Sequence, residues 1–395
     1  MLILAIESTC DETGASIVED GRRVLSNVVA SQIDLHAKYR GVVPEIASRA
    51  HIENILPVLR ESLNNAACGL ADIDAIAVAH RPGLIGSLLI GVTAAKALAW
   101  SLGKPLIGVD HVHSHLYSVM LEEGSGVRVQ GSGNTKADPS AQPSSSLNPE
   151  PQTLNPPSDS SFIPSASSGQ ALHRSSFSPF PAVGLVCSGG HTALYRLNHW
   201  LDVQLIGTTI DDAVGEAYDK VAAILGLGYP GGPILDRLAE QGDPKAIDFP
   251  RSLMARDSLD FSFSGLKTAV LYNVQGVPTK NSKPSRVPPP LDEKRLADIA
   301  ASFQAACVDV LVRKIKRAAK LINAQSIIIG GGVSANRGLR AALANFSLPV
   351  FFPPMPYCTD NAAMSAGLAH LYLTAGRTSP LDLDAITYSQ FVESL

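Results

Sequence analysis

The chain has 395 residues, of which 45% are hydrophobic and 17% charged, and its formal net charge is −4. This length allows two domains with proper cores, and the apolar content excludes a mostly disordered protein. The slightly acidic balance excludes a protein that holds RNA through one broad basic face, so any nucleic-acid contact must use local patches or a partner. The five cysteines are scattered without zinc-ribbon or thioredoxin spacing, which is typical of free thiols in a reducing compartment.

No targeting or membrane segment is expected. The opening residues "MLILAIES" lack the basic region and cleavage site of a signal peptide. The most apolar stretch, 84–100, is interrupted by three small residues and Lys96 and is shorter than the ~20 clean residues of a membrane span. It predicts a buried helix, and the chain as a whole predicts a cytoplasmic protein that does not contact membranes.

In chain order, residues 2–31 alternate short β-rich runs with polar turns, which predicts a strand meander with an Asp-Gly turn at 20–21. Pro44 stands at an expected first helical position, and apolar residues recur at helical spacing after it. Residues 73–80 predict a buried strand, followed by a turn and the apolar helix. The run "LIGVD" at 106–110 predicts another strand, which ends at His111.

Two segments differ in character from the rest of the chain. Residues 123–180 are rich in Ser, Pro, Asn and Gly and cannot bury enough apolar surface to fold, so they predict a disordered insertion. A tolerated surface insertion and a regulated, partner-binding segment are both compatible with this composition. Residues 273–294 predict a smaller flexible insertion of the same kind.

The opening pattern returns after the long insertion. Residues 181–199 again predict a strand, a polar turn "CSGGHT" and a second strand, and units that alternate helix and strand follow. The two parts share this theme without close sequence identity. We therefore expect an α/β protein with a duplicated fold around a central ligand cleft.

The segment "HVHSH" offers metal ligands. His111 and His115 are four residues apart, so on a helix they share one face and can bind one ion, whereas His113 points away. Asp360 precedes a helix-like run, where it is either an N-cap or the third ligand of a two-His, one-carboxylate set. Such a set favours Fe²⁺, with Zn²⁺ as the usual competitor.

Other motifs point to an anion and to acid–base chemistry. Asp11 and Glu12 lie in a Ser/Thr turn, where they are either solvated or placed to hold a cation or act as a base. Glycine turns at 188–190, 231–232 and 330–332 let backbone amides approach an anion. Asp219 and Asn336 are placed either to bind a ribose or base, or simply at a helix surface and a helix start.

Ten motifs in order carry a resemblance to a known family. They include "IESTCDETGASIV", "PGLIGSLLIG", "HVHSH", "SGGHT", "LGLGYPGGP" and "GGGVSANR". The chain resembles the bacterial tRNA N6-adenosine threonylcarbamoyltransferases, formerly called O-sialoglycoprotein endopeptidases. The match spans nearly everything except the two Ser/Pro-rich segments.

The resemblance implies an actin-like, two-lobed fold of the sugar-kinase and Hsp70 type. Residues 1–122 would form the first lobe, completed by a helix at about 359–377, and 181–358 the second. The family's metal ligands fall on His111, His115 and Asp360. Its adenylate-binding positions fall on Val186, Cys187, Ser188, Gly189, Gly190, Asp219, Gly232, Asp236 and Asn336.

The implied reaction transfers threonylcarbamoyl from threonylcarbamoyl-AMP to the N6 amine of the adenosine 3′ to the tRNA anticodon. Asp11 or Glu12 is our candidate for the group that takes up the amine proton. The ion would be Fe²⁺, with Zn²⁺ or Mg²⁺ as alternatives. The resemblance implies an inactive paralogue and a P-loop ATPase as partners, and a homodimer is the alternative assembly. An ATP-dependent small-molecule kinase and a metalloprotease remain alternative functions.

Overall fold

The computed structural model describes residues 1–39, 41–124, 179–253, 258–277, 289 and 291–391. Almost all of the predicted insertion 123–180 lies outside these residues, and so does the middle of the predicted insertion 273–294. The two ends of the smaller insertion are helical, because α7 (Ser264–Gln275) extends into it and α8 (Glu293–Ile322) begins within it. The predicted limits of that insertion were therefore too wide.

The first sheet has the strand order β5-β4-β1-β2-β3-β6. Strands β1 (Leu2–Glu7), β2 (Glu12–Glu19) and β3 (Arg23–Ser31) form the predicted antiparallel meander. Asp20 and Gly21 both have positive φ, 50° and 73°, as a two-residue type I′ turn requires. Strands β4 (Ala75–Arg81), β5 (Leu106–Asp110) and β6 (Glu122–Glu123) add parallel neighbours.

The second sheet repeats this topology. Its order is β11-β10-β7-β8-β9, with an antiparallel meander of β7 (Ala182–Cys187), β8 (Thr192–His199) and β9 (Asp202–Thr208). Strands β10 (Ser326–Gly330) and β11 (Val350–Phe351) are parallel to β7. Order and direction match β5-β4-β1-β2-β3 strand for strand. The predicted α/β class is confirmed, and the repeated strand order is what a duplicated chain would give.

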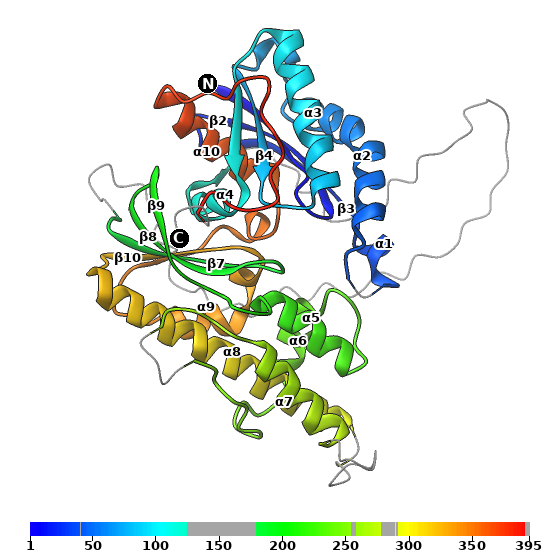
Figure 1. Ribbon diagram of the computed structural model, residues 1–395, viewed down its shortest axis with the longest axis vertical. Coiled ribbons are helices and arrows are strands. Elements are labelled where there is room, and N and C mark those ends of the chain that lie inside the picture. The colour runs from blue at the N-terminus through cyan, green and yellow to red at the C-terminus, as the bar shows by residue number, and fades with distance from the viewer. Residues whose placement is uncertain (40, 125–178, 254–257, 278–288, 290, 392–395) are drawn as a thin grey trace, which may run out of the picture.

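Helices separate and cover the sheets (Figure 1). Helix α4 contacts β4 and β5 of the first sheet and β7 and β10 of the second, whereas α10 packs on the first sheet and on α4. Helices α2 and α3 pack on the opposite face of the first sheet. Helix α3 lies toward one end of the molecule and α7 toward the other (Figure 1). The remaining bounds are α1 (Ile33–Ala37), α2 (Pro44–Asn65), α3 (Ile85–Leu102), α4 (His111–Tyr117), α5 (Val214–Ile224), α6 (Gly231–Ala239), α9 (Arg337–Leu343) and α10 (Ala362–Thr374).

Period-2 alternation along β1 divides the core of the first half. Ile3 and Ala5 face a cluster shared with the second sheet, with α4 and with α10, whereas Leu4 and Ile6 face α2 and α3. Both faces of this strand are therefore buried, as its nearly continuous apolar run predicts. The shared cluster fixes α4 between the two sheets.

Only one side of helix α3 is buried, although its sequence predicted a buried helix. Among the described helices it alone has the length and apolarity of a membrane span, yet only a third of that window is buried. Its Ser87, Gly91 and Ala95 face the sheet, and a Cβ at Gly91 would lie 2.3 Å from the Ser8 hydroxyl. The opposite side leaves Leu89 and Trp100 exposed, at 48% and 75%. The expectation of a buried helix is therefore wrong for this outer side.

Candidate metal and adenylate site

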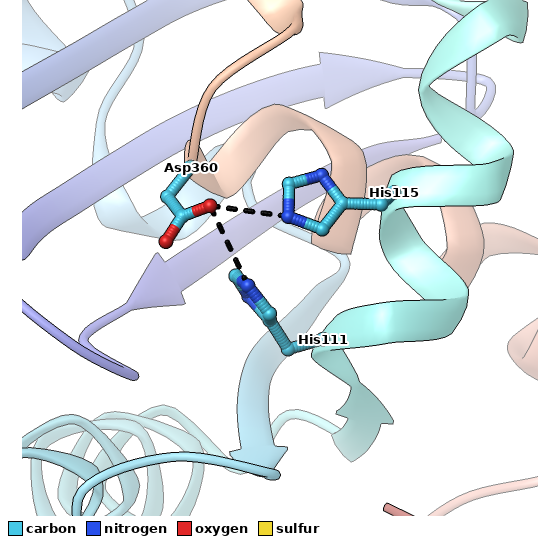
Figure 2. A group of neighbouring side chains, drawn as sticks. All are labelled: His111, His115 and Asp360. Carbon is cyan, nitrogen blue, oxygen red and sulfur yellow. Dashed lines mark ion pairs between the residues drawn. The ribbon is translucent and has the colours of Figure 1, made fainter. Parts of the chain in front are cut away.

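The two predicted metal-binding histidines lie on one face of α4. Strand β5 ends at Asp110, whose Oδ1 accepts hydrogen bonds from the Val112 and His113 amides, and the helix begins at His111. His111 and His115 are one turn apart and point the same way (Figure 2). His113 points elsewhere, as predicted, and its Nε2 donates to the Trp200 carbonyl at 2.6 Å.

Asp360 reaches the same point from the other end of the chain. Its Oδ1 lies 3.1 Å from His115 Nε2 and 3.5 Å from His111 Nε2 (Figure 2). The N-cap of α10 is the next residue, Asn361, whose Oδ1 accepts from the Met364 amide at 3.2 Å. The alternative in which Asp360 merely caps a helix is therefore wrong. The ligand atoms of the three residues lie within 4.8 Å of one another.

The donor set fits a divalent cation. Burial lowers the pKa of His115, which favours the neutral imidazole that binds metals. In the described part of the chain neither buried ring nitrogen of His115 makes a hydrogen bond of regular geometry, and the partner of Nε2 is the nearby Asp360 Oδ1 at 3.1 Å. A buried polar atom without a regular hydrogen bond calls for a partner, and a cation between the three side chains would supply it. Although burial raises the pKa of Asp360, His111 and His115 outweigh it and hold that pKa well below its usual range.

Glu7 orients the first of these imidazoles. It ends β1, is fully buried, and its Oε2 lies 3.1 Å from His111 Nδ1, while its Oε1 accepts from the Thr9 amide at 2.9 Å. A proton on Nδ1 leaves Nε2 free to face Asp360, which is the carboxylate–histidine arrangement found behind metal ligands. Glu7 was not among the site residues predicted from the sequence. Its signal was a carboxylate at the end of a buried strand.

Replacement of Glu7 by glutamine is expected to weaken metal binding by roughly 10- to 100-fold, because the ring loses its charged orienting partner. The affinity can be measured by competition with a chromophoric chelator. Glu53→Gln, on an exposed position of α2, is the matched control and should bind metal like the parent protein. Equal affinities for the two variants would contradict the orienting role of Glu7.

The acidic turn between β1 and β2 adjoins this group. Asp11 is only 8% exposed, and burial, followed by the charges of Asp11 and Asp360, raises the pKa of Glu12 well above its usual range. His51 on α2 holds the turn, because its Nε2 donates to the Cys10 carbonyl at 3.1 Å. The alternative of an ordinary solvated carboxylate is therefore wrong for Asp11, whereas Glu12 keeps part of its exposure.

The "SGGHT" turn belongs to the second sheet but lies near the same histidines. Burial lowers the pKa of His191 to about 4, and the charges of His111 and His115 contribute to this lowering. The turn is closed by the Ser188 amide, which donates to the His191 carbonyl at 2.8 Å. Gly189 and Gly190 are exposed, and no atom lies within 4 Å of a Cβ added at either. Open space therefore adjoins the backbone of both glycines. His191 was not among the site residues predicted from the sequence.

Three other predicted adenylate-binding residues accept hydrogen bonds from backbone amides in the first turns of helices. Asp219 Oδ1 accepts from the Gly231 amide at 2.7 Å, and burial raises its pKa, with a contribution from Asp11. Asn336 caps α9 by accepting from the Leu339 amide at 2.9 Å, so it is indeed a helix-start residue. Asp236 accepts from the Arg337 amide at 3.2 Å.

In the described part of the chain, three further members of the predicted set make no such bond through a side chain. Val186 and Cys187 are buried in β7, and Gly232 has open space beside it.

Two residues of the third glycine turn, Gly330 and Gly331, pack against other segments of the protein. A Cβ at Gly330 would lie 2.3 Å from the His115 carbonyl oxygen, and one at Gly331 would lie 2.5 Å from the Cys187 carbonyl oxygen. Gly331 also has a φ of 87°. Gly330 and Gly331 let β10 approach α4 and β7 closely, which corrects the expectation of an anion-binding role for these two residues. Gly330 thereby brings the second sheet against α4, the helix that carries His111 and His115.

The arrangement combines three chemical elements in one place. Two imidazoles and a carboxylate provide ligands for one divalent ion, and the acidic turn provides carboxylates beside them. The neighbouring glycine turn offers exposed backbone amides for an anion. Such a group can polarise a carbonyl, take up a proton and hold a phosphate.

Comparison with known proteins gives one consistent family. The family model for tRNA N6-adenosine threonylcarbamoyltransferase matches residues 23–133 and 166–367. The enzyme of that name from Syntrophotalea carbinolica is 43% identical over 98% of this chain and 95% of its own length. The one from Moorella thermoacetica is 45% identical over 97% of this chain and 95% of its own length.

Solved structures agree on the fold. The HypF structure from T. kodakarensis has a TM-score of 0.54 at 14% identity and covers 95% of this chain. A full-length HypF structure has a TM-score of 0.51 at 13% identity and covers 98%. This chain spans about half of each HypF chain, 48% and 47%. The sequence matches, in contrast, are nearly full length, and the chain belongs to the tRNA N6-adenosine threonylcarbamoyltransferase family.

Proposed function

We propose that this protein transfers the threonylcarbamoyl group from threonylcarbamoyl-AMP to the N6 amine of the adenosine 3′ to the anticodon, in tRNAs that read codons starting with A. The observation that carries the proposal is the convergence of His111, His115 and Asp360 beside the acidic turn and the Gly189–Gly190 bend. The two sheets would form the two lobes of an actin-like fold, with the substrates in a cleft between them.

His111, His115 and Asp360 would hold one divalent ion, Fe²⁺ in our proposal, with Zn²⁺ or Mg²⁺ as alternatives. Bound there, the ion would polarise the carbonyl of the threonylcarbamoyl group. Two neutral imidazoles and one carboxylate leave the ion with net positive charge. Glu7 would keep His111 in the ligating tautomer throughout the reaction.

The second sheet would bind the adenylate. The amides of Gly189 and Gly190 would face its phosphate, since both lie at the exposed end of β7. Asp219 and Asn336 would bind the nucleoside side, and Asp236 and Gly232 would line the same site. Val186 and Cys187 would contribute backbone only, because their side chains are buried.

The acidic turn would handle the proton. In the transfer, the N6 nitrogen forms a bond to the carbamoyl carbon, the bond between that carbon and the phosphate oxygen breaks, and AMP leaves. The amine loses one proton, which Glu12 or Asp11 would accept. The base acted on is single-stranded in the anticodon loop, so presenting it avoids the cost of opening a duplex.

One assay separates this function from its competitors. Metal-loaded protein is mixed with threonylcarbamoyl-AMP and unmodified tRNA, and the modified nucleoside is measured after digestion. We expect modification that depends on the protein and on the donor. Phosphoryl transfer from ATP to a small molecule, or peptide cleavage, in place of this product would favour the kinase or the metalloprotease.

We propose an inactive paralogue of the same fold as a partner, docked on the outer side of α2 and α3 in the cytoplasm. Ile52 and Leu56 on α2 are 60% and 58% exposed, and Ile85 and Leu89 on α3 are 49% and 48% exposed. Helices α2 and α3 approach each other closely at Gly86, where an added Cβ would lie 2.3 Å from the Ser48 hydroxyl. The four exposed apolar side chains therefore lie on either side of the line along which the two helices meet. A P-loop ATPase would join the assembly at a surface that we do not assign.

Replacing both Ile52 and Leu56 by glutamate is expected to abolish binding of this paralogue, because two charges would be buried in an apolar contact. Co-purification and analytical ultracentrifugation measure the complex. Leu321→Glu is the matched control, since Leu321 is 68% exposed on α8. If the double variant still binds the paralogue, the docking face lies elsewhere. If the parent chain self-associates and the double variant does not, the homodimer is favoured.

A further inference from the structure

The C-terminal segment that follows α10 returns to the metal-binding helix. We propose that residues 389–391 are positioning residues that hold the start of α4, and with it His111, in the geometry that binds metal. This inference rests on the proposed metal site and adds to it an element of the chain that neither the motifs nor the family match covers. The family match ends at residue 367.

The first contact is with the residue that caps α4. Asp110 is 1% exposed, and its Oδ1 accepts from the Val112 and His113 amides. Its Oδ2 accepts from the Ser389 hydroxyl at 2.8 Å and from the Gln390 amide at 3.0 Å. One carboxylate therefore binds the helix start through one oxygen and the C-terminal segment through the other.

A cation reinforces this contact. The Arg81 side chain, at the end of β4, donates from Nη2 to Gln390 Oε1 at 3.0 Å and lies 3.9 Å from Asp110 Oδ2. The segment thus satisfies the buried carboxylate together with Arg81. Without the segment, one oxygen of a buried charge would lose both of its hydrogen bonds, which is costly in a protein interior.

The second contact is apolar. Phe391 is 7% exposed, and its ring packs edge-on against His113 of α4 at 5.8 Å and against Tyr195 of β8 at 5.3 Å, measured between ring centroids. The ring lies between the metal-binding helix and the second sheet. It fills space on the side of α4 that faces away from His111 and His115.

Both contacts act on His111 through the backbone. His111 directly follows Asp110, so a rotation of the helix start moves its imidazole relative to Asp360. His115 Nε2 and His111 Nε2 are already at different distances from Asp360 Oδ1, 3.1 and 3.5 Å. A metal centre tolerates only small errors in ligand position, so a loosened helix start should bind metal more weakly.

The test uses the full chain with Ser389→Ala and with Phe391→Ala. Each metal-free variant is titrated with Co²⁺, whose visible absorption spectrum reports the coordination geometry. We expect affinity to fall by roughly 10- to 100-fold and the spectrum to change, as for other outer-shell partners of metal ligands. Phe391→Leu should restore much of the affinity. Tyr388→Ala, at a 50% exposed position, is the control and should match the parent.

Parent-like affinity and spectrum in both alanine variants would overturn the inference. If Phe391→Ala does not fold, as judged by thermal unfolding, Ser389→Ala decides, because it removes one hydroxyl only. Failure of the metal site itself looks different. In that case the parent protein either binds no Co²⁺ or binds it with an affinity that His111→Ala does not change, whatever the C-terminal segment does.

Discussion

Replacing His111 by alanine is expected to slow threonylcarbamoyl transfer to tRNA by roughly a hundred- to a thousand-fold or more, the usual effect of losing one electrostatic contact to a reacting carbonyl. The variant removes one of two imidazoles that meet Asp360 within 4.8 Å. It also leaves Glu7, fully buried, without its hydrogen-bond partner at Nδ1. Single-turnover rates with preformed donor, together with the metal content of the protein, measure both effects.

Asp360→Asn provides the complementary change, since it keeps the shape of the side chain and removes its charge. It should lose metal and activity together, as His111→Ala does. His199→Ala is the control for removing an imidazole, because His199 is exposed at the end of β8. Full transfer by His111→Ala with no loss of bound metal would remove the basis for the proposed metal chemistry.

The local parts of this site could be predicted from the sequence. Histidines four residues apart predict two rings on one face of a helix, and the structure has this arrangement, with Asp110 as a cap that was not predicted. The Asp-Gly turn and the Pro44 helix start were predicted on equally local grounds. In each case the information lies within one turn of helix or one hairpin.

The long-range parts could not be predicted in this way. The arrival of Asp360 beside the imidazoles was expected from the resemblance, not from any periodicity. The contacts of Glu7 with His111 and of Phe391 with His113 join segments that only the packed fold brings together. The same holds for the electrostatic influence of His111 and His115 on His191. No spacing along the chain reports them.

Glycine shows why a residue type alone was ambiguous. Gly189 has open space beside it, whereas Gly330 has the His115 carbonyl where its Cβ would be. Gly330 ends β10, Gly189 follows the end of β7 by two residues, and both stand in a glycine run. The sequence therefore could not separate room for a ligand from room for another segment of the protein. The same limit applies to α3, whose apolar outer side was expected to be buried.

This distinction predicts the structural effect of Gly330→Ala. The added methyl group would collide with backbone, not with a flexible side chain, so β10 or α4 must shift. The shift would act on His115 itself, through its own carbonyl. This close approach ties the second sheet to α4, as does Phe391, which packs against both His113 and Tyr195.

Glu12→Gln is expected to slow transfer by roughly a hundred- to ten-thousand-fold, the usual contribution of a general base. Burial and the charge of Asp11 raise the pKa of Glu12 well above its usual range. A carboxyl group accepts a proton only when it is ionised, so the parent rate should rise with pH through this raised pKa and fall as the group becomes protonated. In Glu12→Gln that rise should disappear, because glutamine does not titrate.

The comparison of Glu12→Gln with Asp11→Asn identifies the base. The residue whose replacement removes the pH-dependent rise accepts the proton, and the other affects the rate without changing the shape of the profile. Rates are measured in single turnovers from acidic to alkaline pH, with metal content determined at each pH, so that loss of the ion is not mistaken for protonation. A profile that keeps its rise in both variants would show that neither carboxylate is the base. The proton would then leave through another group, and the buried acidic turn would serve chiefly to hold positive charge beside Asp360.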